Sequence, residues 1–300
     1  MSSGSSLLLI DKPSQVTSFS ALSPIKRSIA KKVGHCGTLD KFATGLLIVL
    51  TGSYTRLNQL FSSLDKTYEA VVEFGKQTDT LDPEGTITHS GSIPTRTEVQ
   101  QVISSQFLGS IMQEPPVYSA LHIDGKRAHV LARQGEEVTI PKRRVTIYSL
   151  TVEHWDPPFA HLAIHCSKGT YIRSLARDIA LACNSRAYVK ELKRTAIGPY
   201  KLTEAALAED EPALRAQIQQ SEKQLARLPN IAHMVLNKEA TRRLWYGNLP
   251  NERGIISSTA KQQDTHVVLQ NEHAQSLAVA ALNDALLPHK LVGYIGAKDR

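Results

Sequence analysis

Short apolar runs of strand length alternate with stretches of amphipathic, helix-like spacing from residue 7 to about residue 200. The run Gly45–Leu50 has the length of a buried strand, and no run in the sequence approaches the roughly 20 apolar residues that cross a bilayer. This alternation predicts a mixed α+β body. The expected strands are Leu7–Ile10, Gly45–Leu50, Thr67–Phe74, Val145–Trp155 and Phe159–Cys166.

Amphipathic spacing predicts helices between these strands. One helix is expected from a cap at Thr17 or Ser18 to about residue 32. Another is expected at Glu98–Phe107, and a third at about residues 126–133.

A further helix is expected after the Lys168-Gly169-Thr170 segment. Its apolar residues are Ile172, Leu175, Ala176, Ile179 and Ala180. Their spacing places them on one face, which leaves Tyr171 and Arg173 near the N-terminal end of the helix.

The character of the sequence changes after Tyr200. Residues 203–228 are rich in Ala, Glu and Gln, which is consistent with a helical connector. Beyond them, Trp245-Tyr246 and the strand-like Val267–Leu269 suggest a small second unit. We therefore expect one domain at residues 1–228 and a second at residues 229–300.

Charge and cysteine content narrow the classes of function. The chain carries 35 Lys and Arg against 28 Asp and Glu, a formal charge of +7 that suits a polyanionic partner. Candidate phosphate contacts are Lys26, Arg27, Lys31, Lys32, Lys126, Arg127, Lys142, Arg143 and Arg144. The three cysteines form no Cys-x-x-Cys pair, which argues against a disulfide scaffold and a zinc site. The N-terminal segment has no basic start and meets Asp11 too early for a signal peptide, so a cytoplasmic protein is expected.

Residues 34–45, GHCGTLDKFATG, are the segment that says most about chemistry. Gly34 and Gly37 let a large ligand approach the backbone, and the segment can present Asp40 at the end of a sheet. A glycine-rich turn with a solvated aspartate has the same composition, so this pattern alone leaves both interpretations open. A phosphate-binding loop is excluded, because Lys41 does not stand in a Gly-Lys-Ser/Thr arrangement.

Six blocks in one order over the first 200 residues resemble tRNA pseudouridine synthases of the TruB family. They are Leu9–Pro13 with Thr17-Ser18, the GHCGTLD loop, Lys66–Tyr68 with the TDTLDPEG stretch, Pro115–Leu121, His165–Arg173 and Leu192–Thr195. The resemblance implies an α+β fold with a mixed, largely antiparallel central sheet flanked by helices. It also implies a small PUA-like, β-rich C-terminal domain that binds RNA.

The resemblance further implies a reaction and a set of site residues. The reaction is the isomerisation of the T-loop uridine at position 55 of tRNA, with no cofactor and no metal. Asp40 would be the catalytic carboxylate, Tyr68 would stack on the uracil, and Arg173 would pair with Asp40 and favour its ionised form. The substrate-binding positions would be His35, Asp82, Tyr171, Leu192 and Lys12. Without the family match, Arg173 would be taken for an exposed helical arginine and Tyr68 for a core aromatic.

Two positions depart from the family pattern. Lys41 stands where the family usually has proline directly after the catalytic aspartate, so the loop loses a residue that fixes φ near −65°. Gln15 stands where the family commonly has glycine. Neither change removes a reactive group, and both concern the shape of the loops.

Three other functions compete with this interpretation. The first is a non-catalytic RNA-binding or RNA-folding protein on the same scaffold. The second is a glycosidase that releases uracil, which would need a water-activating group and an acid. The third is the related guide-RNA-dependent enzyme, which has dedicated protein partners. We expect the stand-alone type, a monomer that reads the T-stem-loop of tRNA without a guide RNA, an obligate protein partner or a membrane.

Overall fold

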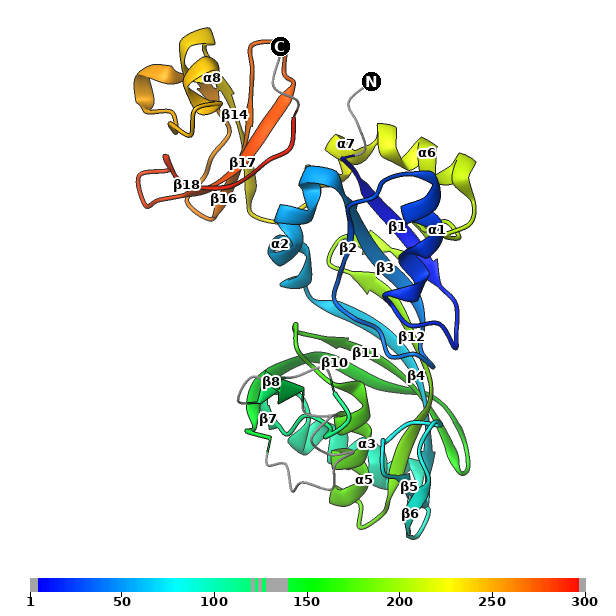
Figure 1. Ribbon diagram of the computed structural model, residues 1–300. Helices are drawn as coiled ribbons and strands as arrows, with labels where there is room; N and C mark the ends of the chain where they lie inside the picture. Colours follow the sequence, from blue (N-terminus) through cyan, green and yellow to red (C-terminus); the bar gives the residue numbers. More distant parts are fainter. Residues whose placement is uncertain (1–4, 120–121, 124–125, 128–139, 297–300) are drawn as a thin grey trace.

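The computed structural model describes residues 5–119, 122–123, 126–127 and 140–296 (Figure 1). Within them, nine strands form the main sheet in the order β1-β3-β12-β4-β11-β10-β7, with β2 beside β3 and β13 beside β12. Their bounds are β1 Leu7–Lys12, β2 Val33–Cys36, β3 Thr44–Thr51, β4 Lys66–Phe74, β7 Gly109–Gln113, β10 Arg143–Asp156, β11 Phe159–Cys166, β12 Ala187–Ile197 and β13 Tyr200–Lys201. Strands β12 and β3 pair in parallel, and the other pairings are antiparallel. The expected mixed, largely antiparallel sheet is confirmed.

Two helices cover one face of this sheet. They are α3 (Arg96–Gln106) and α5 (Ile172–Ala182), which lie side by side in Figure 1. Alternate residues of β4, including Tyr68 and Val72, join the buried cluster that α3 and α5 complete. The residues between them, Glu69 and Val71, point to the opposite face, since successive side chains of a strand alternate.

Two of the helices expected from the sequence are wrong. After β1 the chain forms a 3-10 turn, η1 (Ser20–Leu22), and a short helix, α1 (Ser23–Ser28), which ends well before residue 32. Tertiary contacts replace the last expected turn: the Lys32 carbonyl accepts from the Gly52 N–H at 2.9 Å, and residues 33–36 form β2 and pair with β3. Lys126-Arg127 form strand β9, paired with β8 (His122–Ile123), as the hairpin-type Asp-Gly sequence between them favours. Residues 128–133 lie outside the described residues.

The remaining elements connect or extend this body. A small hairpin consists of β5 (Lys76–Thr78) and β6 (Ile87–Ser90), and η2 (Gly52–Leu57) leads into α2 (Asn58–Ser62). The connector contains η3 (Leu202–Glu204), α6 (Glu211–Gln219) and α7 (Ser221–Leu225), and both α6 and α7 pack against β1.

A second, smaller sheet follows the connector. Its order is β15-β14-β16-β17-β18. The bounds are β14 Ile231–Leu236, β15 Ile255–Ser258, β16 His266–Gln270, β17 Ser276–Leu282 and β18 Pro288–Tyr294, with α8 Lys238–Leu244 and η4 Glu252–Gly254 between strands. Val268 and Val279 of this sheet share a buried cluster with Tyr54 and Leu57 of the main body. The domain boundary at residues 228 and 229 and the PUA-like assignment stay predictions. Among the described helices, none is long and apolar enough to cross a membrane.

Candidate active site

The loop between β2 and β3 carries Asp40. Ser18, which is buried, holds this loop: its Oγ accepts from the Leu39 N–H at 2.8 Å and donates to the Leu39 carbonyl at 3.0 Å. The Ala43 N–H closes a turn on the Asp40 carbonyl at 3.2 Å. Gly37 has a φ of +80°, and Gly45 has a φ of +103°, where a Cβ would collide with the backbone of Arg194. The glycines therefore allow the loop to sit tightly against β12.

The Arg173 guanidinium joins this loop to two other segments. Its Nη2 donates to Asp40 Oδ1 at 2.9 Å and its Nη1 donates to Asp82 Oδ2 at 3.0 Å. The same two nitrogens donate to the carbonyls of Tyr118 at 3.0 Å and Thr80 at 2.8 Å. Arg173 is 3% exposed, so the sequence-based view of an exposed helical arginine is excluded. The predicted trio of Asp40, Asp82 and Arg173 lies together.

Two opposing effects set the charge state of Asp40. Burial raises the pKa of the Asp40 carboxyl above its ordinary value, and the Arg173 guanidinium opposes that rise. The neighbouring carboxylates of Asp82 and Glu84 raise the same pKa further. The Asp40 side chain nevertheless keeps 34% of its surface exposed, so it faces a space that a ligand can enter.

A cavity of about 360 Å³ opens at this carboxylate. Tyr68, Tyr171 and Leu192 line it together with Asp40 and Arg173. Tyr68 is 8% exposed, and burial raises the pKa of its phenol. These five predicted residues therefore share one pocket, and Asp82 supports it through Arg173.

Three predicted substrate-binding residues do not line this cavity: Asp82, which contacts it only through Arg173, Lys12 and His35. Lys12 is fully buried, and its Nζ donates to the carbonyls of Pro13 at 2.8 Å, Val16 at 2.6 Å and Lys41 at 3.3 Å. Burial lowers the pKa of Lys12 to about 8. His35 lies on β2 with its Nδ1 buried and without a hydrogen-bond partner among the described residues, and burial lowers its pKa.

Sequence reasoning gave no site role to three cations at this cavity. Arg194 is 1% exposed and donates to the carbonyls of Leu46 at 2.8 Å and Gly37 at 3.0 Å. Lys66 is also buried, and burial lowers its pKa to about 8. Strand parity could have found both, since Arg194 shares a face with Leu192 and Lys66 with Tyr68. Arg143 was predicted only as a phosphate contact, and its guanidinium lies 4.5 Å from the Tyr171 ring centroid.

Outside the family pattern, Gln15 adopts a φ of +63°. This left-handed conformation explains why glycine suits the position, since other residues adopt it at a cost of about 1 kcal/mol. Lys41 forms an ion pair with Glu84 at 3.1 Å. The loop keeps its turn without proline.

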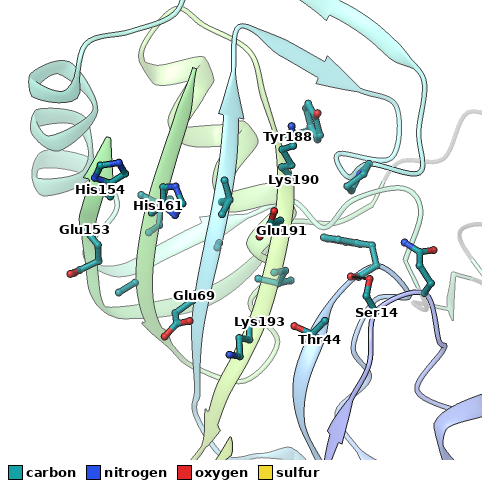
Figure 2. Close-up of a pocket in the computed structure, with 18 residues that line it drawn as sticks. Ser14, Thr44, Glu69, Glu153, His154, His161, Tyr188, Lys190, Glu191 and Lys193 are labelled. Atoms are coloured by element: carbon teal, nitrogen blue, oxygen red, sulfur yellow. Dashed lines mark hydrogen bonds between the residues drawn. The ribbon is translucent and has the colours of Figure 1, made fainter. Parts of the chain in front are cut away.

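A larger cavity, of about 1000 Å³, lies on the open face of the sheet (Figure 2). Glu69, His161 and Lys193 from three neighbouring strands line it, with Ser14 and Thr44 across from them. Of the predicted site residues it contains Leu192 alone. Glutamates and lysines mix on its walls, which is a poor surface for phosphate groups. The smaller cavity at Asp40 is therefore the candidate active site.

Comparisons with known proteins bear on this cavity. The family model described as "TruB family pseudouridylate synthase (N terminal domain)" matches residues 26–172. A curated relative from Borreliella burgdorferi, named tRNA pseudouridine synthase B, is 47% identical over 206 residues, 68% of this chain and 73% of the relative. A relative of the same name from an Azoarcus species is 43% identical over 204 residues, covering 68% of each chain.

Solved structures confirm the fold. A chain from the "Crystal Structure of a Cbf5-Nop10-Gar1 Complex" superposes with a TM-score of 0.69 and 24% sequence identity. The match covers 98% of this chain and 84% of that chain. Among the described residues, His, Cys, Asp and Glu form no group that could hold a metal ion.

Proposed function

This chain belongs to the TruB family of pseudouridylate synthases, and we propose that it isomerises the T-loop uridine at position 55 of tRNA. Curated relatives that are 43–47% identical are named tRNA pseudouridine synthase B, which supports tRNA as the substrate. The observation that carries the proposal is the carboxylate of Asp40, partly exposed in a cavity and paired with the buried Arg173.

The reaction needs few protein groups. The N1–C1′ bond of the uridine breaks, the detached uracil turns, C5 bonds to C1′, and the C5 proton leaves. Asp40 attacks C1′ as the N1–C1′ bond breaks and leaves again when C5 bonds to C1′. Alternatively it removes a proton from C2′ to give a glycal and returns that proton to C2′ when C5 bonds to C1′. Because the base returns to the same sugar, no second carboxylate is needed to activate water, as it is in glycoside hydrolysis. The ion pair with Arg173 keeps Asp40 ionised for either route.

A T-loop uridine must leave its stack to reach Asp40. The cavity of about 360 Å³ suits one flipped nucleotide, with Tyr68 stacking on the uracil and Tyr171 and Leu192 as walls. Tyr68 is also the candidate for accepting the C5 proton. His35, beside the loop on β2, contacts the RNA around the extruded nucleotide.

We base the proposed oligomeric state and partners on the resemblance to stand-alone enzymes of the family. The enzyme acts as a monomer, without guide RNA, protein partner or cofactor, and residues 229–300 add a second RNA-binding domain. The formal charge of +7 supports binding to the phosphates of tRNA.

Tritium release tests this proposal. A tRNA transcript with 5-tritiated uridine is incubated with the wild type and with Asp40→Asn, and RNA affinity is measured for both proteins. We expect release by the wild type only, with similar affinity, and no release once the T-loop uridine is replaced. Binding without release by either protein would leave a role in RNA folding or binding. Release of free uracil would point to a glycosidase.

A further inference from the structure

Gln113, the last residue of β7, forms two side-chain hydrogen bonds to the backbone just before α5. Its Nε2 donates to the Tyr171 carbonyl at 3.1 Å, and its Oε1 accepts from the Tyr171 N–H at 2.8 Å. Gln113 is fully buried. Tyr171 is the residue that precedes the first turn of α5, and its own side chain makes no capping hydrogen bond. The amide of Gln113 therefore fixes both backbone groups of Tyr171.

The residues after Gln113 hold the same end of the helix. The Glu114 carbonyl accepts from Ser174 Oγ at 2.8 Å and from Arg177 Nη2 at 3.0 Å. The Tyr118 carbonyl accepts from Arg173 Nη2 at 3.0 Å. Residues 113–118 thus pack against the start of α5. Gln113 contributes its side chain to these contacts, whereas Glu114 and Tyr118 contribute their carbonyls.

Arg173 follows Tyr171 by two residues, and its guanidinium makes the ion pair with Asp40. We infer that Gln113 is a positioning residue for the isomerisation: its amide sets the backbone from which Arg173 reaches Asp40. This inference rests on the proposed function for its rate effect. Gln113 is neutral and does not line the Asp40 cavity, so it acts through Tyr171 and Arg173.

The size of the effect follows from geometry. A shift of about 1 Å in a reacting group can cost roughly a hundredfold in rate. Methionine at position 113 has a similar length and no amide, so it removes both hydrogen bonds with little loss of volume. The Tyr171 N–H then loses its partner, and the Tyr171 carbonyl keeps only the Leu175 N–H at 3.0 Å. The backbone ahead of Arg173 is therefore held less firmly, and the approach of Arg173 to Asp40 is less well fixed.

The chain contains a matched control. Gln217 on α6 grips Leu9 on β1 in the same way, with Oε1 accepting from the Leu9 N–H at 2.7 Å and Nε2 donating to its carbonyl at 3.1 Å. Leu9 packs in a buried cluster beneath the other part of the sheet and does not line the Asp40 cavity. Gln217→Met therefore removes the same two hydrogen bonds away from Arg173, together with a longer one from Gln217 Nε2 to the Glu204 carbonyl at 3.4 Å.

The experiment compares Gln113→Met with Gln217→Met in two assays. Tritium release gives kcat and KM, and the carboxyl 13C shift of Asp40, assigned with Asp40→Asn, gives its pKa in the free protein. We expect kcat to fall about tenfold to a hundredfold in Gln113→Met, with KM nearly unchanged. The pKa of Asp40 should rise in Gln113→Met, because Arg173 then opposes burial less well, and Gln217→Met should leave both quantities unchanged.

Equal effects of the two substitutions on kcat and on the Asp40 titration would overturn the inference. If Gln113→Met does not fold, Gln113→Asn and Gln217→Asn replace the pair, since asparagine keeps a neutral amide but is one methylene too short to reach both backbone groups. If the wild type releases no tritium, the proposed function fails, while the Asp40 titration still decides whether Gln113 positions Arg173.

Discussion

Two buried arginines border the Asp40 cavity and differ in the groups that accept their hydrogen bonds. Arg173 donates to the carboxylates of Asp40 and Asp82 as well as to two carbonyls. Arg194 donates to the carbonyls of Gly37 and Leu46, and among the described residues it has no carboxylate partner. Both are nearly inaccessible to solvent. The first therefore tunes a reacting group, and the second ties the two ends of the Asp40 loop to β12.

Two lysines near the site belong with Arg194. Lys12 donates to three carbonyls, and Lys66 donates to the carbonyls of Ser62, at 2.6 Å, and Leu64. Burial lowers the pKa of each lysine to about 8. Arg194 also opposes the rise that burial gives to the pKa of the Tyr68 phenol. The two lysines and Arg194 thus shape the site through carbonyls, and Arg173 is the cation that acts on the charge of Asp40.

Replacement of Arg173 should have the largest effect. Arg173→Met leaves Asp40 and Asp82 without their shared cation, and breaking such a buried pair costs about 3–5 kcal/mol of unfolding free energy. We expect isomerisation to fall about a hundredfold to a thousandfold, as when a preorganised electrostatic group is removed. Tritium release and urea denaturation measure the two effects.

The pH dependence of kcat tests whether Arg173 lowers the pKa of Asp40. Asp40 acts ionised, so kcat should fall as the pH drops through a pKa that burial holds above the ordinary carboxyl value. Arg173→Lys, which keeps the charge and loses the planar fork, should move this acid limb to higher pH. A limb at the same pH in both proteins would contradict the tuning role of Arg173.

Arg194 should give a smaller and different effect. Arg194→Met leaves two buried carbonyls without a donor, which lowers the unfolding free energy by about 1–3 kcal/mol. We expect kcat to fall roughly tenfold, because the Asp40 loop loosens, while the acid limb stays where it is. If the acid limb moved as far as in Arg173→Lys, the distinction between the two arginines would be lost.

The sequence predicted the reacting side of this comparison better than its scaffold. Local pattern places Asp40 on a glycine-containing loop before a buried strand and Arg173 near the start of an amphipathic helix, whereas the pairing of the two came from the family resemblance. The burial of Arg194 does not follow from local pattern, because it depends on the parallel contact of β12 with β3, which joins residues about 150 apart. The helix expected up to residue 32 was wrong for a more local reason, since the Lys32 carbonyl accepts from the Gly52 N–H and β2 pairs with the next strand along the chain, β3.

The contribution of Lys12, a cation bound by carbonyls, to the unfolding free energy should depend on pH. The folded chain releases the Lys12 proton near pH 8, and the unfolded chain keeps it up to the ordinary lysine value of 10.5. The unfolded state therefore binds more protons in this window, and the contribution of Lys12 to the unfolding free energy rises with pH. We expect the difference in stability between the wild type and Lys12→Met to grow by about 2 kcal/mol from pH 7.5 to pH 10. Urea denaturation at both pH values measures it, and a constant or shrinking difference would rule out the lowered pKa.

Lys41 should have the smallest effect, although it departs from the family pattern directly beside Asp40. Its ion pair with Glu84 joins side chains that are 48% and 38% exposed, and such surface pairs contribute about 0–1 kcal/mol. We expect Lys41→Ala to change the unfolding free energy by less than about 1 kcal/mol and to keep most of the activity, because Ser18 and the Asp40–Ala43 turn hold the loop.

The partner of Lys41, Glu84, separates the effect of charge from that of loop shape. Glu84→Gln removes a carboxylate that raises the pKa of Asp40, so the acid limb should move slightly to lower pH. A large loss of kcat in Lys41→Ala with an unmoved acid limb would instead show that Lys41 shapes the catalytic loop.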